Sequence, residues 1–236
     1  MRCDRTFEPD EFLTCDCQHP CAHDADMVFF SEGLLAGTPV ATPDGWVAVD
    51  HLDPGDQVLT FDNGPMRIAE RHEALPAEPD VWPVVHWPRA IPPGVLGNRA
   101  TLRLLPGQLV LLESDTAEAM FGDPFALIPA RALDGWRGIA PERPMPDERT
   151  ICLLFDTEQI VYASSATLLH CPGALGEDLA VLHHLSRAAQ AAYAPLSLTA
   201  ARQLVACLMA EDIGAALSQA APRGGQAAFA GAEKRP

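Results

Sequence analysis

The sequence predicts a mainly β domain followed by a small helical part. Between residues 35 and 60, apolar and polar residues alternate over short runs, which is typical of half-buried strands. Clusters of Pro, Asp and Gly interrupt this stretch twice and indicate tight turns. From Leu175 onward the pattern changes, because leucines recur there at helical spacing. A chain of 236 residues is long enough for one sizeable core with an appendage.

The first strands are separated by two well-marked turns. Residues 43–45 read Pro-Asp-Gly and residues 53–56 read Asp-Pro-Gly-Asp. Proline presets the φ of a turn, and glycine adopts a positive φ without steric cost. We therefore expect strands over residues 40–42, 46–49 and 58–60. Further along, residues 101–112 read as two strands on either side of a Pro-Gly turn.

The same opening stretch resembles a known protein family. Its order and spacing of turn residues are similar to the first block of the hedgehog/intein, or Hint, domain, especially its short bacterial branch. The positions that carry the resemblance are Gly37, Thr38, Asp44, Gly45, Pro54, Gly55 and Asp56. The resemblance implies a Hint-like β fold of curved hairpins. The alternative is any β-rich protein with two Pro-Asp-Gly-like turns.

Four segments follow from these patterns. Residues 1–30 form a leader that is rich in Cys and His and that we expect to be flexible. Residues 31–172 form the Hint-like β domain. Residues 173–221 form a helical hairpin, and residues 222–236 read as a disordered tail because they are rich in Gly, Ala and charge.

The resemblance also implies a chemistry that this chain lacks the usual residues to perform. The resemblance implies self-processing. In this chemistry a thiol or hydroxyl at the first position of the domain attacks the preceding carbonyl, and a histidine in the second conserved block of the family assists. Gly33 or Leu34 occupies the nucleophile position here, and Gln108 occupies the histidine position. An amide cannot transfer a proton at neutral pH. His170 is followed by Cys171 without the Asn that splicing inteins use.

We therefore expect a degenerate self-processing module that acts as a structural or interaction domain, and not an enzyme. The enzymatic alternative is residual autoproteolysis by an N-to-S or N-to-O acyl shift through a non-standard nucleophile. Its candidate nucleophiles and acids are Ser31, Thr38, Cys171, His170, His51, His72 and His86.

A third hypothesis is metal binding by the leader. Soft and imidazole ligands alternate there, at Cys15, Cys17, His19, Cys21 and His23. Such ligands suit zinc, but the one-residue gaps depart from the usual spacing of structural zinc sites. A mobile leader or redox chemistry are the alternatives, and no other cofactor is expected. The chain has seven cysteines and an acidic N-terminus unlike a Sec signal peptide, so we expect reduced thiols and, by default, a cytoplasmic location.

Charge and hydropathy restrict the partners. A net charge of −16 argues against nucleic acid, whose binding depends on clustered Lys and Arg. Apolar runs are too short to cross a membrane. We expect the C-terminal helices to contact an unknown protein partner or a second copy. The second helix, capped by Thr199, is expected to bury one apolar face: Leu204, Val205, Leu208, Met209, Ile213 and Leu217.

Overall fold

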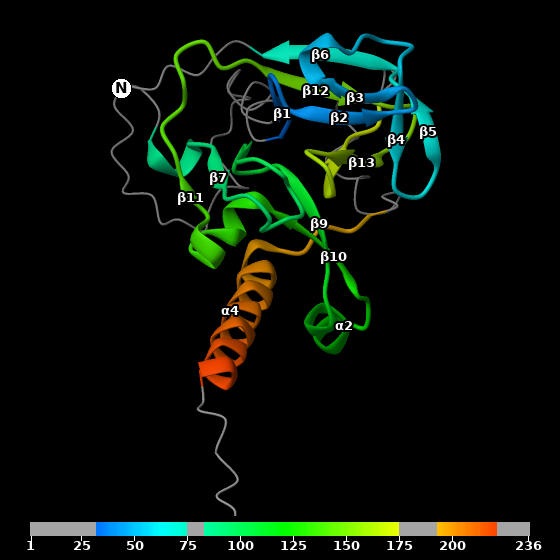
Figure 1. Ribbon diagram of the computed structural model, residues 1–236. Helices are drawn as coiled ribbons and strands as arrows, with labels where there is room; N and C mark the ends of the chain where they lie inside the picture. Colours follow the sequence, from blue (N-terminus) through cyan, green and yellow to red (C-terminus); the bar gives the residue numbers. More distant parts are fainter. Residues whose placement is uncertain (1–31, 75–82, 175–192, 221–236) are drawn as a thin grey trace, which may run out of the picture.

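The computed structural model describes residues 32–74, 83–174 and 193–220 (Figure 1). Short strands form the body of the molecule, and one long helix projects from it. Three of the expected features lie outside the described residues: the leader 1–30, the first helix of the hairpin within 175–192, and the tail 222–236.

Strands dominate the described residues, as the alternating pattern predicts. In chain order the strands are β1 (Leu34–Leu35), β2 (Pro39–Thr42), β3 (Gly45–Ala48), β4 (Gln57–Thr60), β5 (Gly64–Arg67), β6 (Glu70–Ala74), β7 (Arg89–Ile91), β8 (Leu102–Leu104), β9 (Leu109–Glu113), β10 (Phe125–Pro129), β11 (Ala140–Pro141), β12 (Thr150–Leu154), β13 (Gln159–Ala163) and β14 (Thr167–Cys171). The α-helices are α2 (Asp115–Phe121) and α4 (Leu198–Ala220), and the 3-10 helices are η1 (Val49–His51), η2 (Val84–His86), η3 (Ala130–Leu133) and η4 (Trp136–Gly138).

The strands form two sheets that share one core. One sheet has the order β11-β7-β8-β1-β12-β6, and the other runs β10-β9-β14-β13-β2-β3, with β4 pairing to both β13 and β5. Pairing between these strands is antiparallel throughout. The core includes fully buried side chains from both sheets, such as Ile151 of β12 and Leu169 of β14, and also Phe155, which follows β12. The prediction of a mainly β fold is confirmed.

The first hairpin forms where the sequence predicts it. Strands β2 and β3 pair with Val40 opposite Val47, and the turn between them is closed by a hydrogen bond of 2.7 Å from Thr42 Oγ1 to the Gly45 carbonyl. Gly45 has a φ of 126°, which a residue with a side chain rarely adopts. The turn therefore depends on glycine at position 45.

The predicted second strand, residues 46–49, is wrong at its last residue, because β3 ends at Ala48. Residues 49–51 form the 3-10 helix η1 instead of continuing the strand. The chain is turned there by the following loop, in which the Asp56 carboxylate accepts a hydrogen bond of 2.9 Å from the Asp53 N–H. Gly55 at a φ of 97° completes this turn before β4 begins.

Strands β8 and β9 exist as predicted, but they do not form a hairpin with each other. β8 pairs with β7 and β1 in one sheet, whereas β9 pairs with β10 and β14 in the other. The Pro106-Gly107 turn thus carries the chain from one sheet to the other. Gln108 lies at this crossing, which places it between the two sheets.

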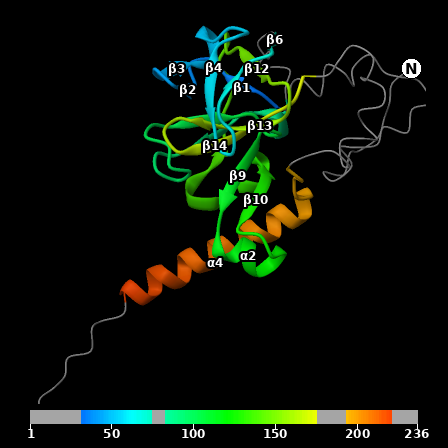
Figure 2. The ribbon, with the colours of Figure 1, turned by 90° about the vertical axis from the view of Figure 1, so that its right-hand side faces the viewer.

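Helix α2 is a feature that the strand pattern did not predict. The Ser114 hydroxyl caps it by accepting hydrogen bonds from the N–H groups of Thr116 and Ala117. Gly122, with a φ of 81°, ends it in the left-handed conformation typical of helix C-caps. The helix lies at the tip of the long β9–β10 hairpin, beside α4 (Figures 1 and 2).

Helix α4 confirms the predicted second helix but differs from it in two respects. It begins at Leu198, and Ser197 caps it instead of Thr199, because the Ser197 hydroxyl accepts a hydrogen bond of 3.2 Å from the Ala200 N–H. Its expected apolar face is only half covered. Leu204 and Val205 are buried, whereas the last expected positions are exposed: Met209, Ile213 and Leu217.

The covered part of α4 is held by apolar packing and by one polar cluster. The Asp212 carboxylate accepts hydrogen bonds from Trp136 Nε1 at 3.0 Å and from Nε and Nη2 of the Arg137 guanidinium, at 2.8 and 2.6 Å. This cluster ties α4 to η4 near the middle of the helix. No helix among the described residues has the length and apolarity needed to span a membrane.

Candidate functional site

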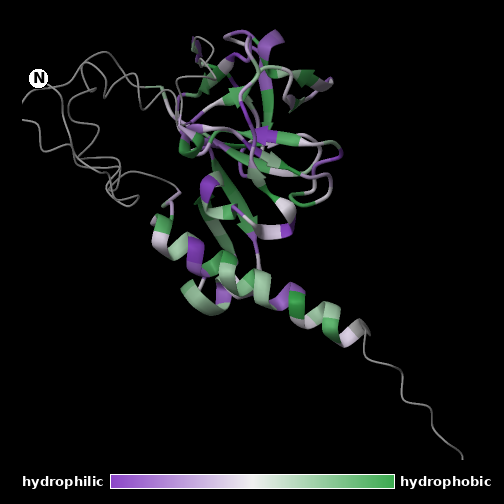
Figure 3. Ribbon diagram, turned by 90° about the vertical axis from the view of Figure 1, so that its left-hand side faces the viewer, coloured by the Kyte–Doolittle hydropathy of each residue, from purple (hydrophilic) through white to green (hydrophobic). Residues whose placement is uncertain are grey.

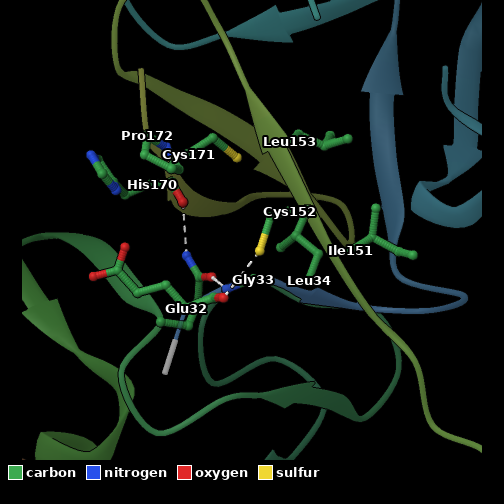
Figure 4. Close-up of a pocket in the computed structure, with 10 residues that line it drawn as sticks. Glu32, Gly33, Leu34, Ile151, Cys152, Leu153, His170, Cys171 and Pro172 are labelled. Atoms are coloured by element: carbon green, nitrogen blue, oxygen red, sulfur yellow. Dashed lines mark hydrogen bonds between the residues drawn. The ribbon is translucent and has the colours of Figure 1, made fainter. Parts of the chain in front are cut away.

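A small pocket lies where the two sheets meet at the start of the β domain (Figure 4). It holds about 260 Å³ of space free of protein atoms, part of which is open to solvent. The residues that line it come from four separate segments: Glu32, Gly33, Leu34, Gln108, Ile151, Cys152, Leu153, His170, Cys171 and Pro172. The fold thus brings together the expected nucleophile position at Gly33 or Leu34, the expected histidine position at Gln108, and the His170-Cys171 pair.

Gln108 joins three segments of this pocket. Its Oε1 accepts a hydrogen bond of 2.9 Å from the Gly33 N–H, and its Nε2 donates to the His170 carbonyl at 2.9 Å and to the Leu109 carbonyl at 3.1 Å. The side chain is only 1% exposed. A buried amide that makes these bonds acts as a bridge between β1, β9 and β14, because its acceptor and its donor both have partners.

Gly33 has a backbone conformation that a side chain opposes. Its φ is 138°, in the region that favours glycine. A Cβ atom built on Gly33 would lie 2.5 Å from Thr150 Cγ2 and 3.0 Å from Cys152 Sγ. The space in which a first-position nucleophile would stand is therefore already occupied. Leu34, the other candidate position, is 1% exposed and belongs to the hydrophobic core.

Cys152 is a pocket residue that the sequence reasoning missed. It lies on β12, and its Sγ donates a hydrogen bond of 3.4 Å to the carbonyl oxygen of Glu32. Burial raises the pKa of its thiol to about 11, and the nearby negative charge of Glu32 adds to this. A cysteine in an apolar strand is ordinarily inert, so the local sequence carries no signal for this contact. The two residues are 120 positions apart.

His170 and Cys171 lie in the pocket wall but do not act on each other. Their side chains point in opposite directions along β14, as successive residues of a strand do (Figure 4). His170 Nε2 lies 3.2 Å from Glu158 Oε2, and the other Glu158 oxygen accepts a hydrogen bond of 2.9 Å from the Tyr193 N–H. Burial raises the pKa of the Cys171 thiol well above its ordinary value. The structure thus shows no histidine that activates this thiol among the described residues.

The other candidate residues lie elsewhere. Thr38 is buried next to β2 and is not among the residues that line the pocket. His51 is the exposed last residue of η1. His86 belongs to η2, where burial and then the positive charges of Arg89 and Arg131 lower its pKa. His72 lies on β6, opposite Cys152 in the strand register.

Two sequence hypotheses fall outside the described residues. Ser31 is one, and the metal-binding cluster of the leader, from Cys15 to His23, is the other. Within residues 32–74, 83–174 and 193–220, no group of three or more His, Cys, Asp or Glu side chains is placed to hold a metal ion. Zinc binding by the leader therefore stays a prediction.

Several solved intein structures resemble this chain. A bacterial intein-like domain from Clostridium thermocellum is 13% identical, with a TM-score of 0.38, and the match covers 59% of this chain and 98% of that one. The MchDnaB-1 intein, in an N145AA form, is 15% identical, with a TM-score of 0.36 and coverage of 59% and 99%. A splice-inactive variant of the AceL NrdHF class 3 split intein is 11% identical, with a TM-score of 0.36 and coverage of 61% and 99%.

The sequence itself matches a known family. No curated protein sequence matches the chain. A model of the Hint domain family, however, matches residues 32–168, which is more than half of the chain. This match begins at the pocket residue Glu32 and ends on β14, so it spans the two sheets described above. The chain therefore belongs to the Hint domain family.

Proposed function

We propose that this Hint domain has lost the self-cleavage typical of such modules and acts as a structural or interaction module. The observation that carries the proposal is the backbone at Gly33. A nucleophile at Gly33 would need a Cβ, and that Cβ would overlap Thr150 Cγ2 at 2.5 Å, while Leu34, the other candidate position, is a buried core residue. Both the glycine at position 33 and the packing of Thr150 against it therefore oppose a nucleophilic side chain there.

The surrounding groups support this proposal. A self-cleaving site needs an activated nucleophile and a group that protonates the leaving amine. Gln108 replaces the family histidine, and its amide is already engaged with Gly33 and His170. The thiols of Cys152 and Cys171 are kept in the protonated form at neutral pH, because burial raises the pKa of each. A protonated thiol is a poor nucleophile.

The first test is the intact mass of the purified full-length chain. We expect a single unchanged mass near 25.3 kDa after days at neutral pH, both with and without an excess of a small thiol. Mass spectrometry checks this directly. A fragment beginning at Gly33 or Leu34 under these neutral conditions would contradict the proposal.

The proposed contact surface is the projecting half of α4. Ile213 is 61% exposed and Leu217 is 67% exposed, and both follow Asp212, whose contacts fasten the helix. Figure 3 shows that this end of α4 projects away from the strands. Four residues apart on a helix, their side chains lie on one face. Large apolar side chains gathered on one face commonly mark an interaction site. We propose that this face binds a protein partner or a second copy of the chain.

Sedimentation velocity over a range of concentrations tests self-association through this face. If a second copy is the partner, the wild type forms dimers, and the double variant Ile213→Asp/Leu217→Asp stays monomeric. The matched control is Ala215→Asp, which adds a charge to an exposed position on the opposite side of the same helix. Equal dimerisation of the double variant and the control would contradict the assignment of this face.

A further inference from the structure

We propose that Arg131 is the centre of a binding site for a small oxyanion, either a phosphate or a carboxylate. The site lies where η3 meets the part of α4 that packs on it and the segment around η2. Arg131 is not among the residues that line the pocket at Gly33. The inference goes beyond the proposed interaction role, because it concerns a small ligand and does not involve Ile213 or Leu217.

The backbone fixes Arg131 at the edge of the hydrophobic core. Its N–H donates a hydrogen bond of 2.9 Å to the Pro106 carbonyl. The other residues of η3 are buried: Ala130, Ala132 and Leu133. Helix α4 packs on this 3-10 helix. The Arg131 side chain therefore leaves a closely packed region, and it is itself half-buried.

The Arg131 guanidinium has no acceptor in the part of the chain that the structure describes. Its Nε is shielded from solvent and has no hydrogen-bond partner. None of the ion pairs among the described residues includes this side chain. A charged donor that has lost part of its water without gaining an acceptor is unfavourable. Arginine cannot avoid this cost by losing its proton, because it stays charged in proteins.

The charges that act on Arg131 are positive. Burial lowers the pKa of its guanidinium, and the positive charges of Arg202 on α4 and Arg89 on β7 lower it further. The pKa of His86 on η2 is lowered by burial and then by the charges of Arg89 and Arg131. Asp134 accepts two hydrogen bonds of 2.9 Å from the Arg89 guanidinium. This carboxylate is therefore engaged with Arg89 and leaves the charge of Arg131 uncompensated.

The frame of the site is held by the bonds of Arg89. This residue is only 3% exposed, and its Nη1 donates to the carbonyls of Val85 and Trp87 at 2.9 and 2.7 Å. These two bonds fasten η2 to β7. The bonds from Arg89 to Asp134 fasten β7 to the residue that follows η3. The surroundings of Arg131 are thus formed before a ligand arrives, so binding requires little ordering of the protein.

A guanidinium in this setting selects an oxyanion. Its planar fork of N–H groups matches two oxygens of a phosphate or a carboxylate. The attraction is stronger than at a fully exposed arginine, because partial burial lowers the local dielectric constant. The positive charges of Arg89 and Arg202 disfavour a cation, and a neutral ligand would not compensate the charge of Arg131. In a chain with a net charge of −16, this group of positive charges is a local feature.

The test is a nuclear magnetic resonance titration of the isotope-labelled full-length chain with inorganic phosphate, at an ionic strength held constant with sodium chloride. We expect saturable shifts of the amides of η3 and of the Arg131 Nε–H. Arg131→Gln should weaken phosphate binding by about tenfold or more, because hydrogen bonds from a charged donor are lost. A parallel titration with acetate separates the two oxyanions. Tighter binding of phosphate assigns the site to a phosphorylated ligand, and equal or tighter binding of acetate assigns it to a carboxylate.

Arg99→Gln is the matched control, because Arg99 is an exposed arginine and its loss changes the net charge by the same amount. This variant should bind phosphate as the wild type does. If neither anion binds the wild type, or if the two substitutions weaken phosphate binding equally, the inference is overturned.

Thermal unfolding without phosphate supplies a second measurement. Arg131→Gln should unfold at the same temperature as the wild type or at a higher one, because it removes an uncompensated charge. In the presence of phosphate, only the wild type and Arg99→Gln should gain stability, since a ligand that binds the folded state alone stabilises it. A lower unfolding temperature of Arg131→Gln without phosphate would show that Arg131 already has a stabilising partner, and the inference would fail.

Discussion

Gly33→Ala is expected to lower the free energy of unfolding by about 3 kcal/mol, which is a large effect for the addition of one methyl group. Two costs combine. An L-residue at a φ of 138° is strained by about 1–2 kcal/mol, and overpacking against a tightly packed neighbour costs about 1–3 kcal/mol. The neighbour here is Thr150 Cγ2, only 2.5 Å from the added carbon. Urea denaturation of the variant and the wild type measures the difference.

Gly37→Ala is the matched control for this prediction. Gly37 also has a positive φ, of 83°, but no atom lies within 4 Å of a Cβ built on it. It carries the conformational cost alone, so we expect a loss of about 1 kcal/mol. Equal effects of the two substitutions would show that the pocket can accommodate a side chain at position 33. The main argument for the lost nucleophile would then fail.

Leu204→Ala is expected to destabilise the attachment of α4 by about 3 kcal/mol. Leu204 is fully buried, at 0% exposure, and packs in the core that the helix shares with η3 and β10. Truncation leaves a cavity, and the loss increases with the volume that stays unfilled. Hydrogen exchange of the α4 amides, together with urea denaturation, measures how far the helix is released.

Leu217→Ala is the control on the same helix. Leu217 is 67% exposed, so its truncation removes little buried surface and should change the stability by less than about 0.5 kcal/mol. If Leu204→Ala were as mild as this control, α4 would not depend on its buried face. The division of the helix into an attached half and a free half would then be wrong.

The local turns of the β domain could be predicted because they depend on near neighbours. The Thr42 to Gly45 hydrogen bond and the Asp53 to Asp56 contact each close within three residues. Glycine at a positive φ is likewise a local property. These same turns carry the resemblance to the Hint family, which the family match over residues 32–168 confirms.

The strand partners could be predicted less well. Residues 102–104 and 109–113 form strands as expected, yet they do not pair with each other. The first pairs with β7 and β1, and the second pairs with β10 and β14. Alternation of apolar residues shows that a segment is a strand, but the choice of partner depends on which faces must be buried. The exposed half of α4 is a second case, because helical periodicity marks an apolar face without showing what covers it.

By itself, the sequence determined the mainly β fold, the family, and the replacement of the expected nucleophile and histidine at Gly33 and Gln108. Only the tertiary structure decided what these replacements do. Gln108 bridges Gly33 and His170, and Cys152 reaches the Glu32 carbonyl from 120 residues away. The physical reason is that turns and strands follow from short-range sterics and alternation, whereas a pocket forms from residues that meet only when two sheets pack.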